Sequence, residues 1–125
     1  MTLDIGVLSS ADGAEVAALI AAVEAGRLSA RIKIVIADRD SPALGLARAA
    51  GLYGLFLPRA AFHANQDGFE RRLVELLAEA GAETLVLAGF TRPVGPVLAQ
   101  SFPGRIYGWG QTAAELVAGL TRLGA

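Results

Sequence analysis

A loop near the start of the chain combines residue types that can bind an anion. The loop consists of Ser10, Ala11, Asp12, Gly13 and Ala14, and it lies between a buried apolar run and the predicted start of a helix. Free backbone N–H groups and the helix dipole favour an anion such as phosphate at that position. The loop lacks the glycine and lysine patterns of the common nucleotide-binding loops. Because the carboxylate of Asp12 would satisfy the same N–H groups, we favour helix capping by Asp12 and keep phosphate binding as the alternative.

Polar side chains also follow later strands. Asp38 and Asp40 come after the second apolar run, where a nucleotide-binding fold can accept a hydrogen bond from a ribose hydroxyl. We favour a solvated loop closed by Arg39. Arg92 follows the fourth apolar run, and an arginine there either clamps a carboxylate or phosphate or lies on the surface. His63 has no partner at a fixed spacing, so we expect a loop residue rather than a base or a metal ligand.

Aromatic and charged residues predict two surfaces. Tyr107 and Trp109 are separated by one glycine. We expect this pair to contact a partner, since buried aromatic side chains dominate interface energetics, and closure of the sheet edge is the alternative. Four charged residues at helical spacings are predicted to form a solvated helix face: Glu70, Arg71, Arg72 and Glu75.

Composition excludes several classes of site. The chain has no cysteine and one histidine, which excludes a disulfide framework, thiolate catalysis and Cys- or His-rich metal sites, so we expect no metal. Eleven basic and 12 acidic residues give a net charge of −1, which offers no field for nucleic acid or an anionic membrane. No apolar run approaches the roughly 20 residues that span a bilayer. The first residues lack the basic region of a secretory signal, so we expect a cytoplasmic protein.

Length and hydrophobic content predict one folded domain over residues 1–125. The hydrophobic fraction of 54% is too high for a disordered chain. Short apolar runs, of which the second is β-branched, alternate with helical patterns along the sequence. Strands are expected at residues 3–8, 32–36, 55–57, 84–88 and 105–107. Helices are expected at residues 13–26, 42–51 and 69–81, from near Pro93, and from Thr112.

This alternation predicts an α/β fold. Strands separated by helices cannot form hairpins, so they should pair in parallel through right-handed crossovers, with helices on both faces. The expected architecture is a three-layer α/β/α sandwich around an open, mostly parallel sheet. Ligands bind such sheets beyond the carboxyl ends of the strands. Here those ends lead into residues 9–13, 37–41 and 89–94.

The same segments resemble a known enzyme family. Residues 5–13, 36–51, 62–73, 85–94 and 104–106 follow the order of the amino-terminal half of the glycinamide ribonucleotide formyltransferase family. The more specific parts are Ala-x-Gly-Leu-x-x-Ala from Ala43 and Leu-Ala-Gly-Phe-x-Arg from Leu87. The resemblance covers roughly residues 3–107. It implies a Rossmann-like sheet and a reaction that transfers a formyl group from a 10-formylfolate to the amine of a ribosyl phosphate.

The resemblance also implies functional positions, several of which are altered. The family's phosphate loop carries glycines, a serine and an asparagine, whereas this chain has carboxylates at Asp12 and Glu15, and like charge weakens phosphate binding. The family's catalytic asparagine and histidine positions are occupied by Gly108 and Gly110, which supply neither a proton acceptor nor an oxyanion donor. The segment beside the family's folate pocket is retained, with Gly89, Phe90, Thr91, Arg92 and Val94.

These features predict a non-catalytic, truncated relative of the family that acts as a binding or interaction module. A formyltransferase half-domain completed by a partner chain is one alternative, and a small phosphometabolite-binding module is another. The cofactor, if there is one, would be a reduced folate such as 10-formyltetrahydrofolate. We expect the final helix to cover the sheet edge near Tyr107 and Trp109, or a second copy or protein partner to pair there.

Overall fold

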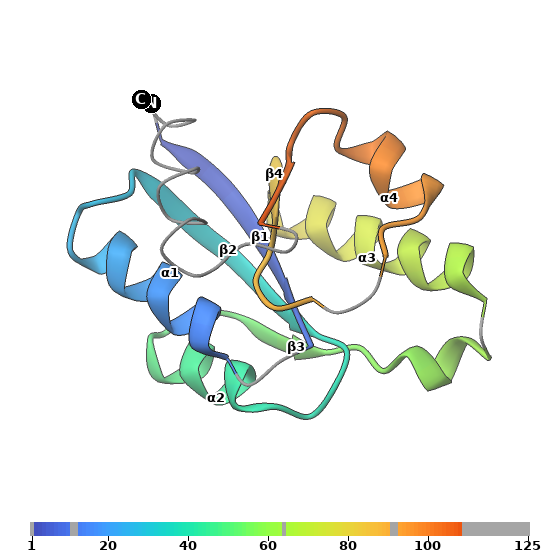
Figure 1. The fold of residues 1–125 in the computed structure, drawn as a ribbon, viewed down its shortest axis with the longest axis horizontal. Coiled ribbons are helices and arrows are strands. Elements are labelled where there is room, and N and C mark those ends of the chain that lie inside the picture. The colour runs from blue at the N-terminus through green and yellow to red at the C-terminus, as the bar shows by residue number, and fades with distance from the viewer. Residues whose placement is uncertain (1, 11–12, 64, 91–92, 109–125) are drawn as a thin grey trace.

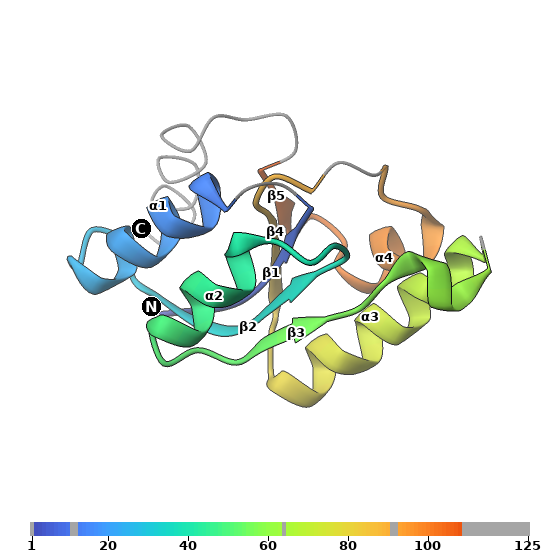
Figure 2. The same cartoon turned by 90° about the horizontal axis from the view of Figure 1, so that it is seen from below.

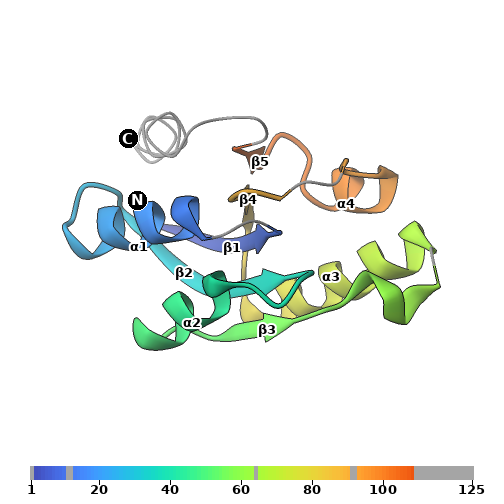
Figure 3. The same ribbon diagram turned by 60° about the horizontal axis from the view of Figure 1, so that its bottom comes forward.

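Five strands form one sheet in the computed structural model, which describes residues 2–10, 13–63, 65–90 and 93–108. The strands are β1 (Leu3–Ser9), β2 (Ala30–Ala37), β3 (Gly54–Phe56), β4 (Thr84–Leu87) and β5 (Ile106–Tyr107). All four pairings are parallel, and the strand order is β3-β2-β1-β4-β5. Figure 3 shows β3 and β5 at opposite sides of this sheet. The predicted open parallel sheet is confirmed.

Helices cover both faces of the sheet, as predicted. They are α1 (Ala14–Glu24), α2 (Pro42–Ala49), α3 (Gln66–Ala80) and α4 (Pro96–Ser101), with a short 3-10 helix, η1 (Arg59–Phe62). Figures 1 and 2 show α1 and α2 together on one side of the sheet, and α3 with α4 on the other. The fold is therefore a three-layer, Rossmann-like α/β/α sandwich.

Each face of the sheet has its own hydrophobic core, which explains why the strands are apolar at nearly every position. On one face, Ile5 and Val7 of β1 pack with Val16 and Leu19 of α1. On the other face, strand residues pack with α3 and α4 in a cluster that includes Leu8, Ile34, Ile36, Leu73, Leu77 and Leu98. The β1–β2 register shifts between Ile5 and Gly6, so side chains on β2 change face at that point.

Several boundaries differ from the sequence prediction; β2, for example, covers residues 30–37 rather than 32–36, and α3 starts at Gln66 rather than at Phe69. The last described helix starts at Pro96 rather than near Pro93, because Gly95 has an extended backbone and serves as its N-cap residue. The third strand covers residues 54–56 rather than 55–57. The connection after it contains η1. The helix predicted from Thr112 lies outside the described residues.

No helix in the described part of the chain is long and apolar enough to cross a membrane.

Candidate functional site

The carboxyl end of β1 is the point where the sheet connections separate. The chain leaves β1 toward α1 on one face and leaves β4 toward α4 on the other, which is the geometry that opens a ligand crevice in α/β sheets. The backbone N–H of Ser10 donates to the carbonyl of Gly89 at 3.0 Å, and that of Asp38 donates to the carbonyl of Ser9 at 3.2 Å. The three loops predicted at this edge are thus brought together.

The first loop leads into α1, which begins without a side-chain cap. Gly13 is the N-cap residue, and its φ of 94° is a left-handed conformation that favours glycine. A Cβ atom there would also lie 3.1 Å from the backbone nitrogen of Ala43, so α1 and α2 begin side by side. Ala14 starts α1, and Glu15 places a carboxylate in its first turn. Ala11 and Asp12 lie outside the described residues, so capping by Asp12 stays a prediction.

Asp38 corrects the expectation of a solvated loop. Its side chain is 3% exposed, and its Oδ2 atom accepts a hydrogen bond from Nε of Arg59 at 3.1 Å. Arg39 and Asp40 are the exposed residues of this loop. The partner of Asp38 is therefore an arginine 21 positions away, brought close by η1, and not its neighbour Arg39.

Arg59 connects three elements at this edge. Its guanidinium carbon lies 4.5 Å from the ring centroid of Phe69 in α3 and 5.4 Å from that of Phe90, just after β4. Phe90 is buried, and the Arg59 side chain is 19% exposed. An arginine over two aromatic rings gains from the ring quadrupoles as well as from its carboxylate partner. Arg59 thereby holds Phe90 in place beside the end of β2.

Glu70 corrects the prediction of a solvated charged face. It is 2% exposed, and its carboxylate accepts hydrogen bonds from two backbone N–H groups at the start of α4. Oε2 accepts from the nitrogen of Gly95 at 2.6 Å, and Oε1 accepts from that of Leu98 at 3.0 Å. The rest of the predicted face is on the surface, where Arg72 and Glu75 form an ion pair at 3.5 Å.

Gln66 extends this contact by one helical turn. Its Nε2 atom donates to Oε2 of Glu70 and to the carbonyl of Pro93, both at 3.2 Å. The first two turns of α3 therefore bind three backbone groups of residues 93–98. This contact starts in the retained segment 89–94, in which Thr91 and Arg92 lie outside the described residues.

A hollow of about 350 Å³ opens beside Val94. It is lined by Leu87, Pro93, Val94 and Ile106, so its walls are apolar and come from the end of β4, the following loop and β5. A hollow of this size could accept part of a ring-shaped ligand.

The last described residues, Tyr107 in β5 and Gly108 directly after it, lie at the border of the site. Tyr107 is half-buried against the core beneath α1, and its hydroxyl donates to the carbonyl of Gly104 at 3.1 Å. Gly108 follows with a φ of 99°, a conformation that side chains disfavour. Trp109 and Gly110 lie outside the described residues.

The remaining loop prediction concerns His63. His63 lies exposed directly after η1, in a left-handed backbone conformation. No group of three His, Cys, Asp or Glu side chains within the described ranges could hold a metal ion.

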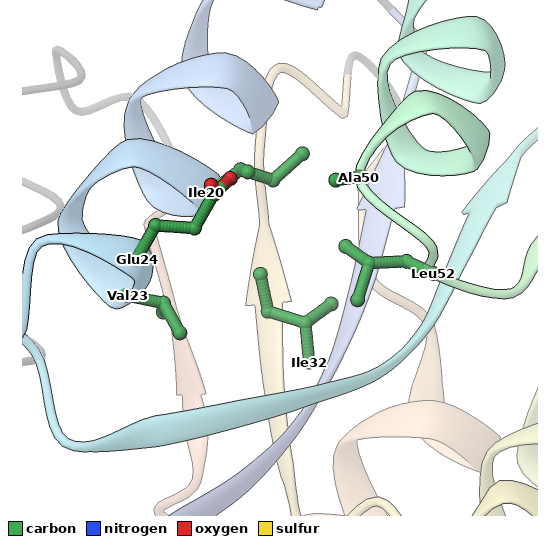
Figure 4. A pocket seen from close by; sticks show the side chains of 6 residues that line it. All are labelled: Ile20, Val23, Glu24, Ile32, Ala50 and Leu52. Atoms are coloured by element: carbon green, nitrogen blue, oxygen red, sulfur yellow. The ribbon is translucent and has the colours of Figure 1, made fainter.

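A second hollow, of about 60 Å³, lies far from this edge, at the carboxyl ends of α1 and α2 (Figure 4). The hollow lies over the first half of β2, and its lining is apolar except for Glu24. Six residues line it: Ile20, Val23, Glu24, Ile32, Ala50 and Leu52. It contains none of the residues predicted to bind a ligand.

Sequence reasoning missed the roles of Arg59, Gln66 and Glu70. The contacts of Arg59 and Glu70 with other elements span 10 to 31 positions, so no local motif marks them. One signal was available for Glu70. It lies three positions before Leu73 and seven before Leu77, which places it on the apolar stripe of α3 rather than on the charged face.

The two buried carboxylates at this edge among the described residues are held in structural contacts. Asp38 pairs with Arg59, and Glu70 accepts from backbone N–H groups. These contacts hold the loops around the apolar hollow.

Comparison with known proteins identifies relatives that share this architecture. The model of the formyl transferase family matches residues 3–107. Phosphoribosylglycinamide formyltransferase of Escherichia coli (strain K12) is 28% identical over 105 residues, which cover 83% of this chain and 49% of that protein.

Two solved structures extend the comparison. Glycinamide ribonucleotide transformylase 1 from Symbiobacterium toebii superposes with a TM-score of 0.80 at 35% identity and covers 84% of this chain and 50% of its own. The phosphoribosylglycinamide formyltransferase of Coxiella burnetii superposes with a TM-score of 0.78 at 31% identity, and the match covers 85% of this chain and 50% of that protein. The chain thus spans about half the length of these relatives. The family match, which includes all five strands, shows that this chain belongs to the formyl transferase family.

Proposed function

We propose that this chain is a binding module of the formyl transferase family that does not transfer a formyl group on its own. The observation that carries the proposal is the residue after β5. The resemblance places a catalytic side chain at Gly108, which has none and adopts a φ that disfavours one. Gly110 occupies the second catalytic position in the sequence.

The ligand that the site favours is a reduced folate such as 10-formyltetrahydrofolate. Support comes from the retained segment 89–94 and from the apolar hollow beside Val94. Planar, largely apolar rings suit such a hollow, with backbone groups of the segment supplying the polar contacts.

Binding of a sugar phosphate has weaker support. Glu15 lies in the first turn of α1, where its negative charge competes with a phosphate for the same helix end. Ser10 already donates its backbone N–H to Gly89. We expect glycinamide ribonucleotide and ribose 5-phosphate to bind less tightly than the folate.

Two measurements on the purified chain test ligand binding and catalysis separately. The first is a thermal-shift titration with a reduced folate, glycinamide ribonucleotide and ribose 5-phosphate, because a ligand that binds only the native state raises the melting temperature. We expect a shift with the folate. The second is a formyl-transfer assay with the E. coli relative as the positive control, in which we expect no turnover by this chain. Turnover, or the absence of any ligand shift, would refute the corresponding half of the proposal.

A second candidate is a half-domain completed by another chain, either a second copy or a protein partner at the β5 edge. The supporting observation is that the family match stops at residue 107, the last residue of β5, while the relatives are about twice as long. An edge strand offers unpaired backbone groups to such a partner.

Association at this edge is tested by analytical ultracentrifugation and backbone amide exchange over a range of concentrations. We expect the mass to rise with concentration, or on addition of a partner chain, while exchange at Tyr107 slows. A monomer with a rapidly exchanging β5 under all conditions would rule this candidate out. Formyl transfer that appears only after mixing with a partner chain would favour it over the binding module.

A further inference from the structure

We propose that Arg59, Gln66 and Glu70 are positioning residues that set the backbone of residues 89–90 and 93–95 for ligand binding. The inference rests on the proposed function, since it assigns these side chains to the segment that would bind the folate. None of the three residues belongs to that segment, and none needs to touch the ligand.

The far end of the segment is held by α3. Glu70 accepts from the nitrogen of Gly95, and Gln66 donates to the carbonyl of Pro93. Space is limited at this contact, because a Cβ atom on Gly95 would lie 2.9 Å from Oε1 of Glu70 and 3.0 Å from Nε2 of Gln66. Glu70 and Gln66 therefore fix the direction of the Gly95 N–H group and the distance between the backbone at residue 95 and α3.

The near end is held by Arg59 and by β1. The Arg59 guanidinium lies over the ring of Phe90, and its orientation is set by the ion pair with Asp38. On the other side, Gly89 accepts from the N–H of Ser10. The described backbone at residues 89–90 and at residues 93–95 is thus held by contacts with other elements.

The carboxylate at position 70 does more than fill space in the core. Its neighbours on the apolar stripe of α3 are Phe69, Leu73 and Leu77, and an apolar side chain of similar size would fill this place but leave the N–H groups of Gly95 and Leu98 without an acceptor. What the carboxylate adds is a directional contact with two N–H groups of another helix, 25 and 28 positions away. That contact determines where α4 starts and where the preceding segment ends.

The experiment compares Glu70→Gln with Glu75→Gln, its matched control on the exposed face of α3. In Glu70→Gln the side-chain NH₂ group faces one of the two N–H donors, so one hydrogen bond is lost. We expect amide exchange at Gly95 and Leu98 to accelerate at least about tenfold, since an unsatisfied buried donor costs that factor or more. Exchange in β1 and β4 should change much less, and Glu75→Gln should change neither. Acceleration that is uniform across the protein would overturn the inference.

Ligand affinity supplies the second readout. At a temperature where both variants are fully folded, we expect the Kd of the reduced folate to rise about tenfold in Glu70→Gln and to stay unchanged in Glu75→Gln. An unchanged Kd in Glu70→Gln would overturn the inference, because a purely structural residue alters the melting temperature but not the affinity of the folded protein. If the wild-type chain binds no folate, the proposed function fails, and amide exchange still decides whether the segment is held in this way.

A compensating pair tests the geometry directly. Gly95→Ala should accelerate exchange at residues 95 and 98, since its Cβ displaces both Glu70 oxygens. Shortening the carboxylate in Glu70→Asp makes room for that methyl group. We expect the double variant to exchange more slowly at these two amides than Gly95→Ala alone, and additive effects of the two substitutions would contradict the proposed contact.

Discussion

Asp38 and Asp4 each pair with an arginine, at 3.1 and 3.0 Å, but the two pairs differ in exposure. The side chain of Asp38 is 3% exposed, whereas Asp4 is 24% exposed and its partner Arg31 is 67% exposed. Asp38→Ala leaves Arg59 largely buried without its counter-charge, so the free energy of unfolding should fall by about 2–4 kcal/mol. Asp4→Ala should cost less than about 1 kcal/mol, because solvent screens an exposed pair. Urea unfolding of both variants checks this, and equal losses would contradict it.

At the scale of single elements, α2 and α3 differ in whether a side chain caps the start of the helix. Asn65 caps α3, and its Oδ1 atom accepts from the nitrogen of Gly68 at 3.0 Å. Ser41 occupies the same position before α2, but its side chain makes no capping bond and its hydroxyl is buried without a partner. Asn65→Ala should therefore destabilise the protein by about 1 kcal/mol, whereas Ser41→Ala should have little effect or stabilise it slightly. Thermal unfolding of the two variants distinguishes these outcomes, and a larger loss at Ser41 would contradict the assignment of the caps.

The packing of α3 on the sheet depends on a glycine in β1. A Cβ atom on Gly6 would collide with Leu77 and would lie 3.1 Å from Cβ of Ala82. Gly6→Ala should destabilise the protein by about 1–3 kcal/mol, because overpacking pushes α3 away from β1. The control is Gly45→Ala in α2, where no atom lies within 4 Å of the added Cβ and alanine should stabilise the helix by up to about 1 kcal/mol. Chemical denaturation measures both changes, and a neutral Gly6→Ala would mean that α3 packs elsewhere.

At the scale of the whole molecule, the two cores meet at the central strands. Residues of β1, β2 and β4 contribute to both cores, whereas β3 is a three-residue edge strand with Phe56 exposed. Because central amides are released only when both cores open, we expect exchange to be slowest in β1 and β4 and faster in β3. Backbone amide exchange followed by NMR tests this order, and protection of β3 equal to that of β1 would indicate that another chain covers the β3 edge.

The sequence alone determined the elements and the layer arrangement. Short apolar runs mark strands buried on both faces, and the helical spacing of leucines marks the helices that cover them. Both signals are local, since they depend on neighbours within a few residues. Parallel pairing then follows from chain length, because the connections are too long for hairpins. The family resemblance likewise could be stated from the order of short segments.

Only the tertiary structure decided which charges are buried and what they contact. Asp38 and Glu70 were expected on the surface, because aspartate and glutamate in polar segments are usually solvated. Their partners in other elements lie 21 to 28 positions away and come within reach only when η1, α3 and α4 pack against the sheet. The start of α4 was misplaced for the same reason, since the contact with Glu70 holds Gly95 in an extended conformation. Burial of a charge is set by distant donors, and local periodicity carries no information about where those donors lie.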